Sequence, residues 1–218
     1  MINFLTKVVV TSTIVLSGIS FGTAKASAAS ISGLGSPIDA ISGGTVIDFE
    51  TAPSGDFANI TVGNITFTGV GAPLTIGSDY DGQFNNSGKS IYNGFDLVPN
   101  QFRFDFGSTV NAFAFNFGAS DSPWLLSSFD VGGNLLESIT IAPVFASNSG
   151  NYFGIAANGI KYATLVEQGG GDYVFIDNFT ATSANTTAVP EPFTIVGTLI
   201  GGTAALRMRK QIKDTNKI

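Results

Sequence analysis

Two segments of alternating phenylalanine constrain the fold of this chain more than any other feature. Phenylalanine occupies every second position of FRFDFG and again of NAFAFNFG. The two triplets are Phe102, Phe104 and Phe106, and Phe113, Phe115 and Phe117. Because successive side chains of a β-strand point to opposite faces, each triplet shares one face of a strand. A buried Phe contributes about 1.5–3 kcal/mol, so the triplets predict a large β core. The chain has no Cys, so no disulfide supports that core.

Short β-rich runs separated by Gly, Asn, Asp and Pro fill the middle of the chain. TVIDFE begins at Thr45, NITVGNITFTG carries a turn dipeptide at Gly63-Asn64, and LLSSFDVGGNLLESITIA is typical of a hairpin with Gly132-Gly133-Asn134 at its turn. YFGIA, IKYATLVE and YVFIDNFTAT follow. About ten short strands at this spacing predict an all-β protein, an antiparallel β-sandwich of the jelly-roll or lectin-like kind. We expect the sandwich over residues 45–182, preceded by an N-terminal extension over residues 29–44.

The first 28 residues are typical of a secretory signal peptide. Lys7 precedes an apolar run over residues 8–21, which would form a signal helix, and small residues follow with cleavage expected after Ala26 or Ala28. The partners expected for this segment are the Sec translocon and signal peptidase. The alternative is an N-terminal anchor that is retained.

The C-terminal segment combines a Pro-Glu-Pro turn, an apolar run and a basic cluster. The turn is Pro190-Glu191-Pro192, the run covers 14 residues from Phe193 to Leu206, and the cluster is Arg207, Arg209 and Lys210. A helix over the run is about 21 Å long, whereas the hydrocarbon core of a bilayer is about 30 Å thick. The run therefore predicts a transmembrane-like helix that anchors the chain only transiently, and the basic cluster would lie in the cytoplasm.

This C-terminal segment resembles the PEP-CTERM sorting signal of exported bacterial proteins. The resemblance implies recognition by an exosortase, which cuts near the motif, and delivery of the protein to the cell surface or the extracellular matrix. We accordingly expect a linker over residues 183–189, the sorting signal over residues 190–210 and a cytoplasmic tail over residues 211–218. The alternative is an ordinary single-pass tail.

Composition excludes several classes of function. The exported part, residues 29–187, holds three basic and 14 acidic residues, so its net charge is −11. Such a body has no electrostatic attraction for nucleic acid, and we expect no nucleic acid partner. The absence of His and Cys excludes Ser-His-Asp triads, Cys-His nucleophiles and His or Cys zinc sites. An enzyme built from this chain would have to rely on carboxylates, Lys, Tyr or an oxygen-bound metal. We keep a carboxylate-dependent glycan hydrolase as the alternative to a non-catalytic protein.

Two groups of residues are candidates for ligand binding. Asp79 and Asp81 in the loop GSDYDGQFNNSG, and Asp177 in the last strand, offer the oxygen ligands that structural Ca²⁺ takes. The alternative is that these carboxylates cap backbone N–H groups of loops. Trp124, the only tryptophan, and Tyr80 could stack on a sugar ring if they are exposed.

The order of the strands from FRFDFG to YVFIDNFTAT also resembles lectin and carbohydrate-binding jelly rolls. This resemblance implies a polysaccharide partner. The function expected from the sequence is therefore non-catalytic: glycan binding, or a structural role in the extracellular polymer layer, with a ligand-free matrix protein as a further alternative.

Overall fold

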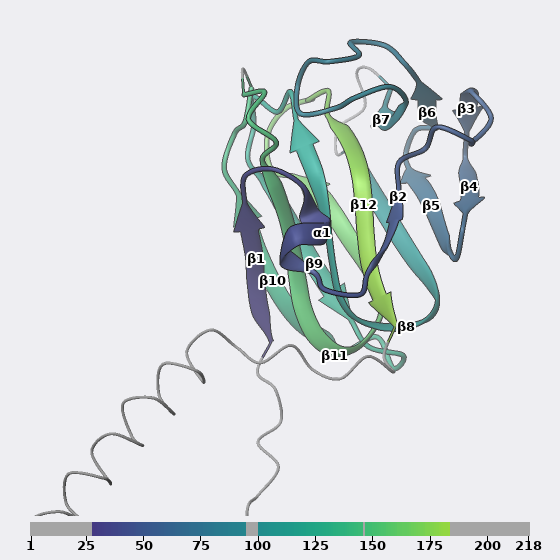
Figure 1. Ribbon diagram of the computed structural model, residues 1–218. Helices are drawn as coiled ribbons and strands as arrows, with labels where there is room; N and C mark the ends of the chain where they lie inside the picture. The colour runs from purple at the N-terminus through teal and green to yellow at the C-terminus, as the bar shows by residue number, and fades with distance from the viewer. Residues whose placement is uncertain (1–27, 95–99, 146, 184–218) are drawn as a thin grey trace, which may run out of the picture.

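The computed structural model describes residues 28–94, 100–145 and 147–183, and these form two packed layers of antiparallel β-strands (Figure 1). The first half of the chain contributes β1 (Ala29–Gly33), α1 (Pro37–Ala40), β2 (Thr45–Ile47), β3 (Gly55–Phe57), β4 (Asn59–Val62), β5 (Ile65–Val70), β6 (Leu74–Gly77) and β7 (Ser90–Asn93). The second half contributes β8 (Gln101–Gly118), β9 (Trp124–Phe129), β10 (Leu135–Ile141), β11 (Tyr152–Glu167) and β12 (Phe175–Ser183). The expected antiparallel β-sandwich is confirmed. No helix in the described ranges has the length and apolar character needed to cross a membrane.

The strand β8 belongs to both layers. Its first half pairs with β5 and with the end of β11, and its second half pairs with β12 and with the start of β11. Between the halves lie Gly107 and Ser108, both exposed, and the register with β11 shifts there. The sequence suggested separate strands in this part of the chain. The structure instead has one continuous strand that turns a corner.

The corner allows one strand to supply both sides of the core. The ring centroids of Phe104 and Phe115 lie 5.6 Å apart, and those of Phe106 and Phe113 lie 5.4 Å apart. In a straight strand, residues 104 and 115 would be about 36 Å apart. The two phenylalanine triplets therefore face each other across the sandwich, and Phe179 of β12 stacks on Phe113 with an interplanar angle of 6°. The prediction that each triplet forms one buried face is confirmed.

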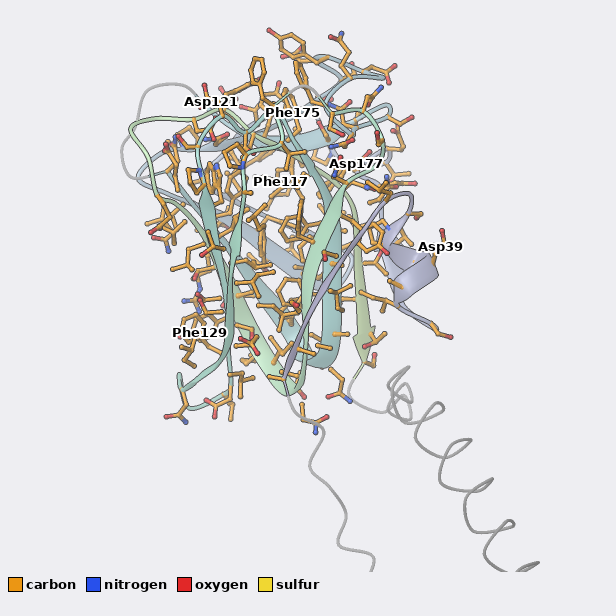
Figure 2. All side chains as sticks on the ribbon, turned by 90° about the vertical axis from the view of Figure 1, so that its left-hand side faces the viewer. Asp39, Phe117, Asp121, Phe129, Phe175 and Asp177 are labelled. Carbon is orange, nitrogen blue, oxygen red and sulfur yellow. The ribbon has the colours of Figure 1, made fainter. Side chains whose placement is uncertain are left out.

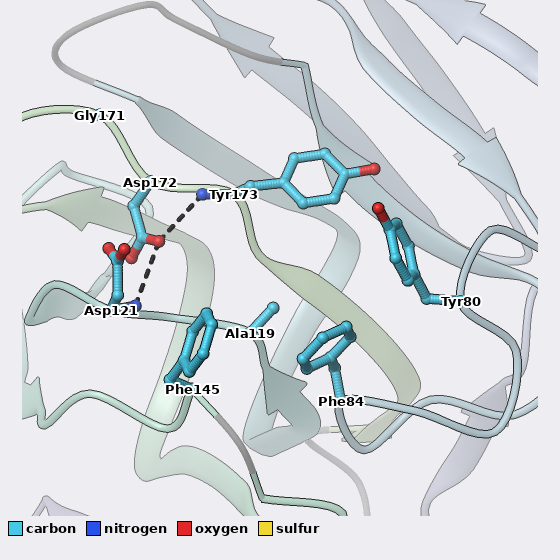
Figure 3. A pocket seen from close by; sticks show the side chains of 8 residues that line it. All are labelled: Tyr80, Phe84, Ala119, Asp121, Phe145, Gly171, Asp172 and Tyr173. Atoms are coloured by element: carbon cyan, nitrogen blue, oxygen red, sulfur yellow. Dashed lines mark hydrogen bonds between the residues drawn. The ribbon is translucent and has the colours of Figure 1, made fainter.

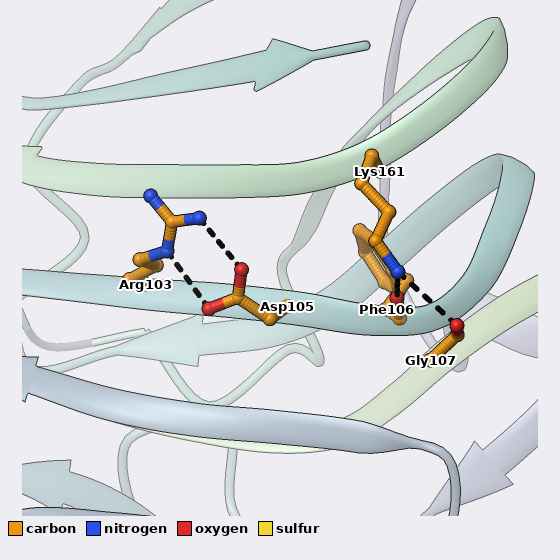
Figure 4. A network of polar contacts seen from close by, with 5 residues as sticks. All are labelled: Arg103, Asp105, Phe106, Gly107 and Lys161. Carbon is orange, nitrogen blue, oxygen red and sulfur yellow. Dashed lines mark hydrogen bonds and ion pairs between the residues drawn. The ribbon is translucent and has the colours of Figure 1, made fainter. Parts of the chain in front are cut away.

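Lys161 of β11 holds the corner of β8 from outside. Its Nζ donates hydrogen bonds to the carbonyl oxygens of Phe106 and Gly107, at 2.5 and 3.1 Å (Figure 4). These carbonyls lie where the ladder between β8 and β11 is interrupted, so the ammonium group supplies donors that the neighbouring strand does not.

The two predicted turns are confirmed, whereas the predicted N-terminal boundary is wrong. Gly63, with φ of 59°, lies in the turn between β4 and β5, and the β9–β10 hairpin turns through residues 130–134. Residues 29–44 were expected to be an extension, but β1 pairs with β11, and Ile41 is 1% exposed. They therefore form part of the sandwich, and α1 contacts β12 and β8. The expected signal helix, linker, sorting signal and tail lie outside the described residues, apart from Ser183.

Candidate functional site

A pocket of about 380 Å³ opens at the end of the sandwich where β8 and β6 stop. Loops after β6, β8, β10 and β11 contribute to its wall (Figure 3). It is lined by Tyr80, Phe84, Ala119, Asp121, Phe145, Gly171, Asp172 and Tyr173. The start of β1 and the end of β12 lie at the opposite end of the sandwich (Figure 1). The pocket therefore faces away from the two points at which the described body continues into the rest of the chain.

Four aromatic rings form an arc along one side of this pocket. Neighbouring ring centroids are 6.4 Å apart from Tyr173 to Tyr80, 5.6 Å from Tyr80 to Phe84 and 6.3 Å from Phe84 to Phe145. Tyr80 is 50% exposed and Phe145 is 59% exposed. Phe84 stacks on the buried Phe175 with an interplanar angle of 4°. A small buried cluster thus supports rings whose outer parts remain open to solvent. We call these four residues the aromatic arc.

Backbone strain is concentrated at the aromatic arc. Tyr80, Phe84 and Ala119 all have positive φ, at 59°, 52° and 67°. Non-glycine residues rarely adopt this conformation, because the Cβ atom then crowds the backbone. They are three of the six such residues in the described part of the chain. Strained residues of this kind cluster at ligand-binding and catalytic sites, so their gathering here makes the pocket a candidate site.

Asp172 organises the acidic side of the pocket. Its carboxylate accepts hydrogen bonds from the backbone N–H groups of Asp121, Ser122 and Tyr173 at 3.2, 3.1 and 2.9 Å, and from Trp124 Nε1 at 2.8 Å. The Asp121 side chain lies within hydrogen-bonding reach of the same carboxylate (Figure 3). Burial raises the pKa of Asp172 above its ordinary value, against the opposing effect of the Trp124 and backbone hydrogen bonds. Asp172 is thus a structural carboxylate, and Asp121, which is exposed, presents the carboxylate that a ligand can reach.

Trp124 is not a stacking residue. Its side chain is fully buried, and its ring contacts Phe102 and Phe117 in the core. Neither face is open to a sugar, so the prediction of stacking by Trp124 is wrong. Its N–H group instead binds Asp172, which links the core to the pocket wall. Tyr80, the other predicted stacking residue, lies exposed in the aromatic arc.

The three predicted calcium ligands each bind protein donors instead of converging on one point. Asp79 accepts from the Tyr92 hydroxyl at 2.8 Å, and Asp81 accepts from Gly88 N at 2.6 Å. Asp177 accepts from the backbone N–H groups of Ser87 and Asn178. Within the described ranges, no group of three or more Asp, Glu, His or Cys side chains could hold a metal ion. The positions of these residues therefore do not support a calcium site. Asp81 and Asp177 instead accept hydrogen bonds from backbone N–H groups, which is the alternative that the sequence left open.

One loop segment is held by three carboxylates from different parts of the chain. The consecutive N–H groups of residues 87–89 donate to Asp177, Asp81 and Glu50 at 3.0, 2.6 and 2.8 Å. Asp177 is 1% exposed, and burial raises its pKa to about 7. These contacts fix the end of the loop that carries Tyr80 and Phe84. Asp81 and Asp177, which the sequence suggested as metal ligands, thus hold the loop that carries part of the aromatic arc.

A second group of aromatic side chains, on the outer face of the β8–β9–β11 layer, is already occupied by its own neighbours. The Tyr162 ring stacks on Phe129 with centroids 4.7 Å apart, and the Arg103 guanidinium lies 3.9 Å from the Tyr162 centroid. Arg103 also forms an ion pair with Asp105 (Figure 4). The Tyr162 ring is thus already in contact with the Phe129 ring and the Arg103 guanidinium.

The acidic pair in the pocket does not have the geometry of a glycoside hydrolase. Retaining enzymes hold two carboxyl groups about 5–5.5 Å apart, and inverting enzymes hold them about 6.5–9.5 Å apart. Asp121 and Asp172 are within hydrogen-bonding reach of each other, and Asp172 is buried beneath four donors. The hydrolase alternative therefore gains no support from this pocket.

Comparison with known proteins finds solved structures with a similar fold. No protein-family model matches the chain, and no curated protein matches it. A solved family 29 carbohydrate-binding module in complex with mannohexaose is similar, with 15% identity over 67% of this chain and 97% of that chain and a TM-score of 0.45. TmCBM61 in complex with β-1,4-galactotriose is also similar, with 14% identity over 55% of this chain and 88% of that chain and a TM-score of 0.34. So is a cleaved adhesin domain of Lys-gingipain from Porphyromonas gingivalis, with 13% identity over 64% of this chain and 98% of that chain and a TM-score of 0.42. At these values the likeness concerns the fold alone.

Proposed function

We propose that this protein is an exported, non-catalytic glycan-binding protein whose ligand site is the pocket lined by the aromatic arc. The observation that carries this proposal is the exposure of Tyr80 and Phe145 beside the acceptor side chain of Asp121. A pyranose ring has an apolar face of C–H groups that packs on aromatic rings, and hydroxyl groups around its rim that need hydrogen-bond partners. The arc supplies the first surface and Asp121 supplies an acceptor for the second.

The size and rigidity of the pocket fit this role. Small-molecule sites have volumes of about 300–1,000 Å³, and the pocket falls at the lower end of that range. Tyr80 and Phe84 are fixed by the supporting ring of Phe175 and by the capped loop over residues 87–89. Rings that are already in place lose little conformational freedom when a ligand binds, which favours affinity.

The proposed location follows from the two ends of the chain. We propose that the signal peptide over residues 1–28 directs export and that an exosortase removes the sorting signal over residues 190–210. The body would then be displayed at the cell surface or in the extracellular matrix. The pocket would point away from the membrane, since it lies at the far end of the sandwich from the end of β12 (Figure 1).

A glycan array probed with the purified chain tests the binding proposal. We expect binding to a defined set of glycans, and its loss in Tyr80→Ala and Phe145→Ala. Phe129→Ala is the matched control, because it removes an aromatic ring at the other end of the molecule (Figure 2). Circular dichroism would verify that all three variants fold. Absence of binding to every glycan, or equal binding by the arc variants and the control, would refute the proposal.

Mass spectrometry of the protein recovered from the producing bacterium tests the proposed sorting. We expect a mature chain that starts after Ala26 or Ala28 and ends near Pro190-Glu191-Pro192. Recovery of extracellular protein that still carries Arg207 through Ile218 would argue against removal of the sorting signal, while leaving the binding proposal intact.

A further inference from the structure

The charge around the pocket restricts the kind of sugar that it can hold. Two of its lining side chains are acidic, and none of the described residues that line it is basic. The three basic residues of residues 29–187 are used elsewhere: Arg103 pairs with Asp105, Lys161 holds the β8 corner, and Lys89 donates to the Ala52 carbonyl oxygen. A ligand with a carboxylate or sulfate would therefore meet only negative charge. The pocket disfavours acidic glycans.

The aromatic arc adds an attraction for positive charge. The faces of aromatic rings carry negative electrostatic potential and attract cations within about 6 Å of the ring centroid. The four rings of the arc run from Tyr173 to Phe145, and the pair Asp121–Asp172 lies between these two ends of the arc (Figure 3). Rings on one side and a carboxylate on the other form the type of site that binds an ammonium group.

The exposed carboxylate is available for such a group. Asp172 is engaged by four N–H donors, but no hydrogen bond from a Lys or Arg side chain to Asp121 occurs among the described residues. Burial raises the pKa of Tyr173 to about 12. Its phenol is therefore neutral at neutral pH and adds no charge to the pocket. The net charge of the pocket at neutral pH thus rests on the acidic pair.

We propose that the pocket selects a sugar that carries a free amine, protonated at neutral pH, over the same sugar with an N-acetyl or hydroxyl group in its place. This inference rests on the proposed glycan-binding function and names its ligand class. The amine would lie against the aromatic arc and the Asp121 carboxylate, and the pyranose ring would fill the remaining volume. A pocket of about 380 Å³ has room for both.

Titration calorimetry with a matched pair of oligosaccharides tests the inference. The purified chain would be titrated with a glucosamine oligomer and with an N-acetylglucosamine oligomer of equal length. We expect the first to bind about tenfold more tightly. We expect the preference to weaken as salt rises, because screening reduces attraction between partly exposed charges.

Two charge-neutralising variants identify the residue responsible. Asp121→Asn should abolish most of the preference for the amine, whereas Asp39→Asn should retain it. Asp39 is exposed on α1, away from the pocket, so this control removes the same charge from another surface (Figure 2). An unchanged preference in Asp121→Asn would overturn the inference.

Failure of the inference and failure of the proposed function give different results. Equal affinity for the two oligomers would overturn the amine preference and leave glycan binding in place. If no oligosaccharide binds but tetramethylammonium does, and Asp121→Asn removes that binding, the pocket recognises cations and the glycan assignment is wrong. If neither sugars nor tetramethylammonium bind, both proposals fail.

Discussion

The packing of the two phenylalanine triplets against each other can be tested by a double-mutant cycle. Phe104 and Phe115 are both fully buried, and their ring centroids lie 5.6 Å apart across the sandwich. Phe104→Leu and Phe115→Leu each keep most of the apolar volume but remove a ring. We expect each to lower the free energy of unfolding by about 1–2 kcal/mol.

The informative quantity is the coupling energy of the pair. A direct ring–ring contact predicts that the effects of Phe104→Leu and Phe115→Leu are not additive, with a coupling of about 0.5–1.5 kcal/mol. The control cycle combines Phe104→Leu with Phe129→Leu, because Phe129 packs on Tyr162 on the outer face. Distant pairs add to within about 0.5 kcal/mol.

Urea unfolding followed by Trp124 fluorescence provides the assay, since this single tryptophan is buried against Phe102 and Phe117 and would become solvent-exposed on unfolding. Equal dependence of the free energy on urea in all variants would show that the unfolding reaction is unchanged. Additive effects for Phe104 and Phe115 would refute the reasoning that β8 turns back and packs against itself.

Three further predictions concern residues that shape the fold and the pocket. Burial raises the pKa of Asp177 to about 7, so the folded state keeps a proton that the unfolded chain releases near pH ~4. The free energy of unfolding should therefore fall as the pH rises from about 4 to 7. Urea unfolding of Asp177→Asn should show a smaller fall over the same range. Gly118→Ala places a Cβ 1.9 Å from the Phe84 carbonyl oxygen and should weaken glycan binding in calorimetry, whereas Gly170→Ala meets no atom within 4 Å and should bind normally. Lys161→Met removes the donors at the β8 corner and should lower the unfolding free energy by about 1–2 kcal/mol; an unchanged urea midpoint would show that the corner needs no such support.

Local patterns predicted the strands and turns because their causes are local. The alternation of Phe102, Phe104 and Phe106 requires only the geometry of one strand, and the turn at Gly63 requires only its own φ of 59°. The corner in β8 was missed because Gly107 interrupts the pattern in the way that a strand end does. Whether the ladder continues past such a residue depends on β11, more than 40 residues further along the chain.

The assignment of residues 29–44 failed for a related reason. The segment is rich in Gly and Ser and shows no period, so nothing local indicates burial. Its strand exists because β11 pairs with β1 from Tyr152 to Ala156, and the segment that includes α1 contacts β12 and β8. Both causes lie on other strands.

The pocket was only partly predictable. Tyr80 stood out as an aromatic residue in a polar loop, but Phe145 has no periodic context, and Trp124 looked exposed beside Asp121, Ser122 and Pro123. Trp124 is buried because its ring packs on Phe102 and Phe117, and Asp172, 48 positions away in the sequence, accepts the hydrogen bond of its N–H group. Aromatic residues in the loops between strands were the only local signal. The tertiary fold brings four loops to one end, and three of them supply aromatic side chains to the pocket.

A crystal structure of the chain with the glycan that binds best tests the central claim most directly. The account predicts a pyranose ring in the pocket, with an apolar face on Tyr80 or Phe145 and a polar group hydrogen-bonded to Asp121. Sugar bound instead on the outer sheet face beside Tyr162, with the aromatic arc empty, would contradict it.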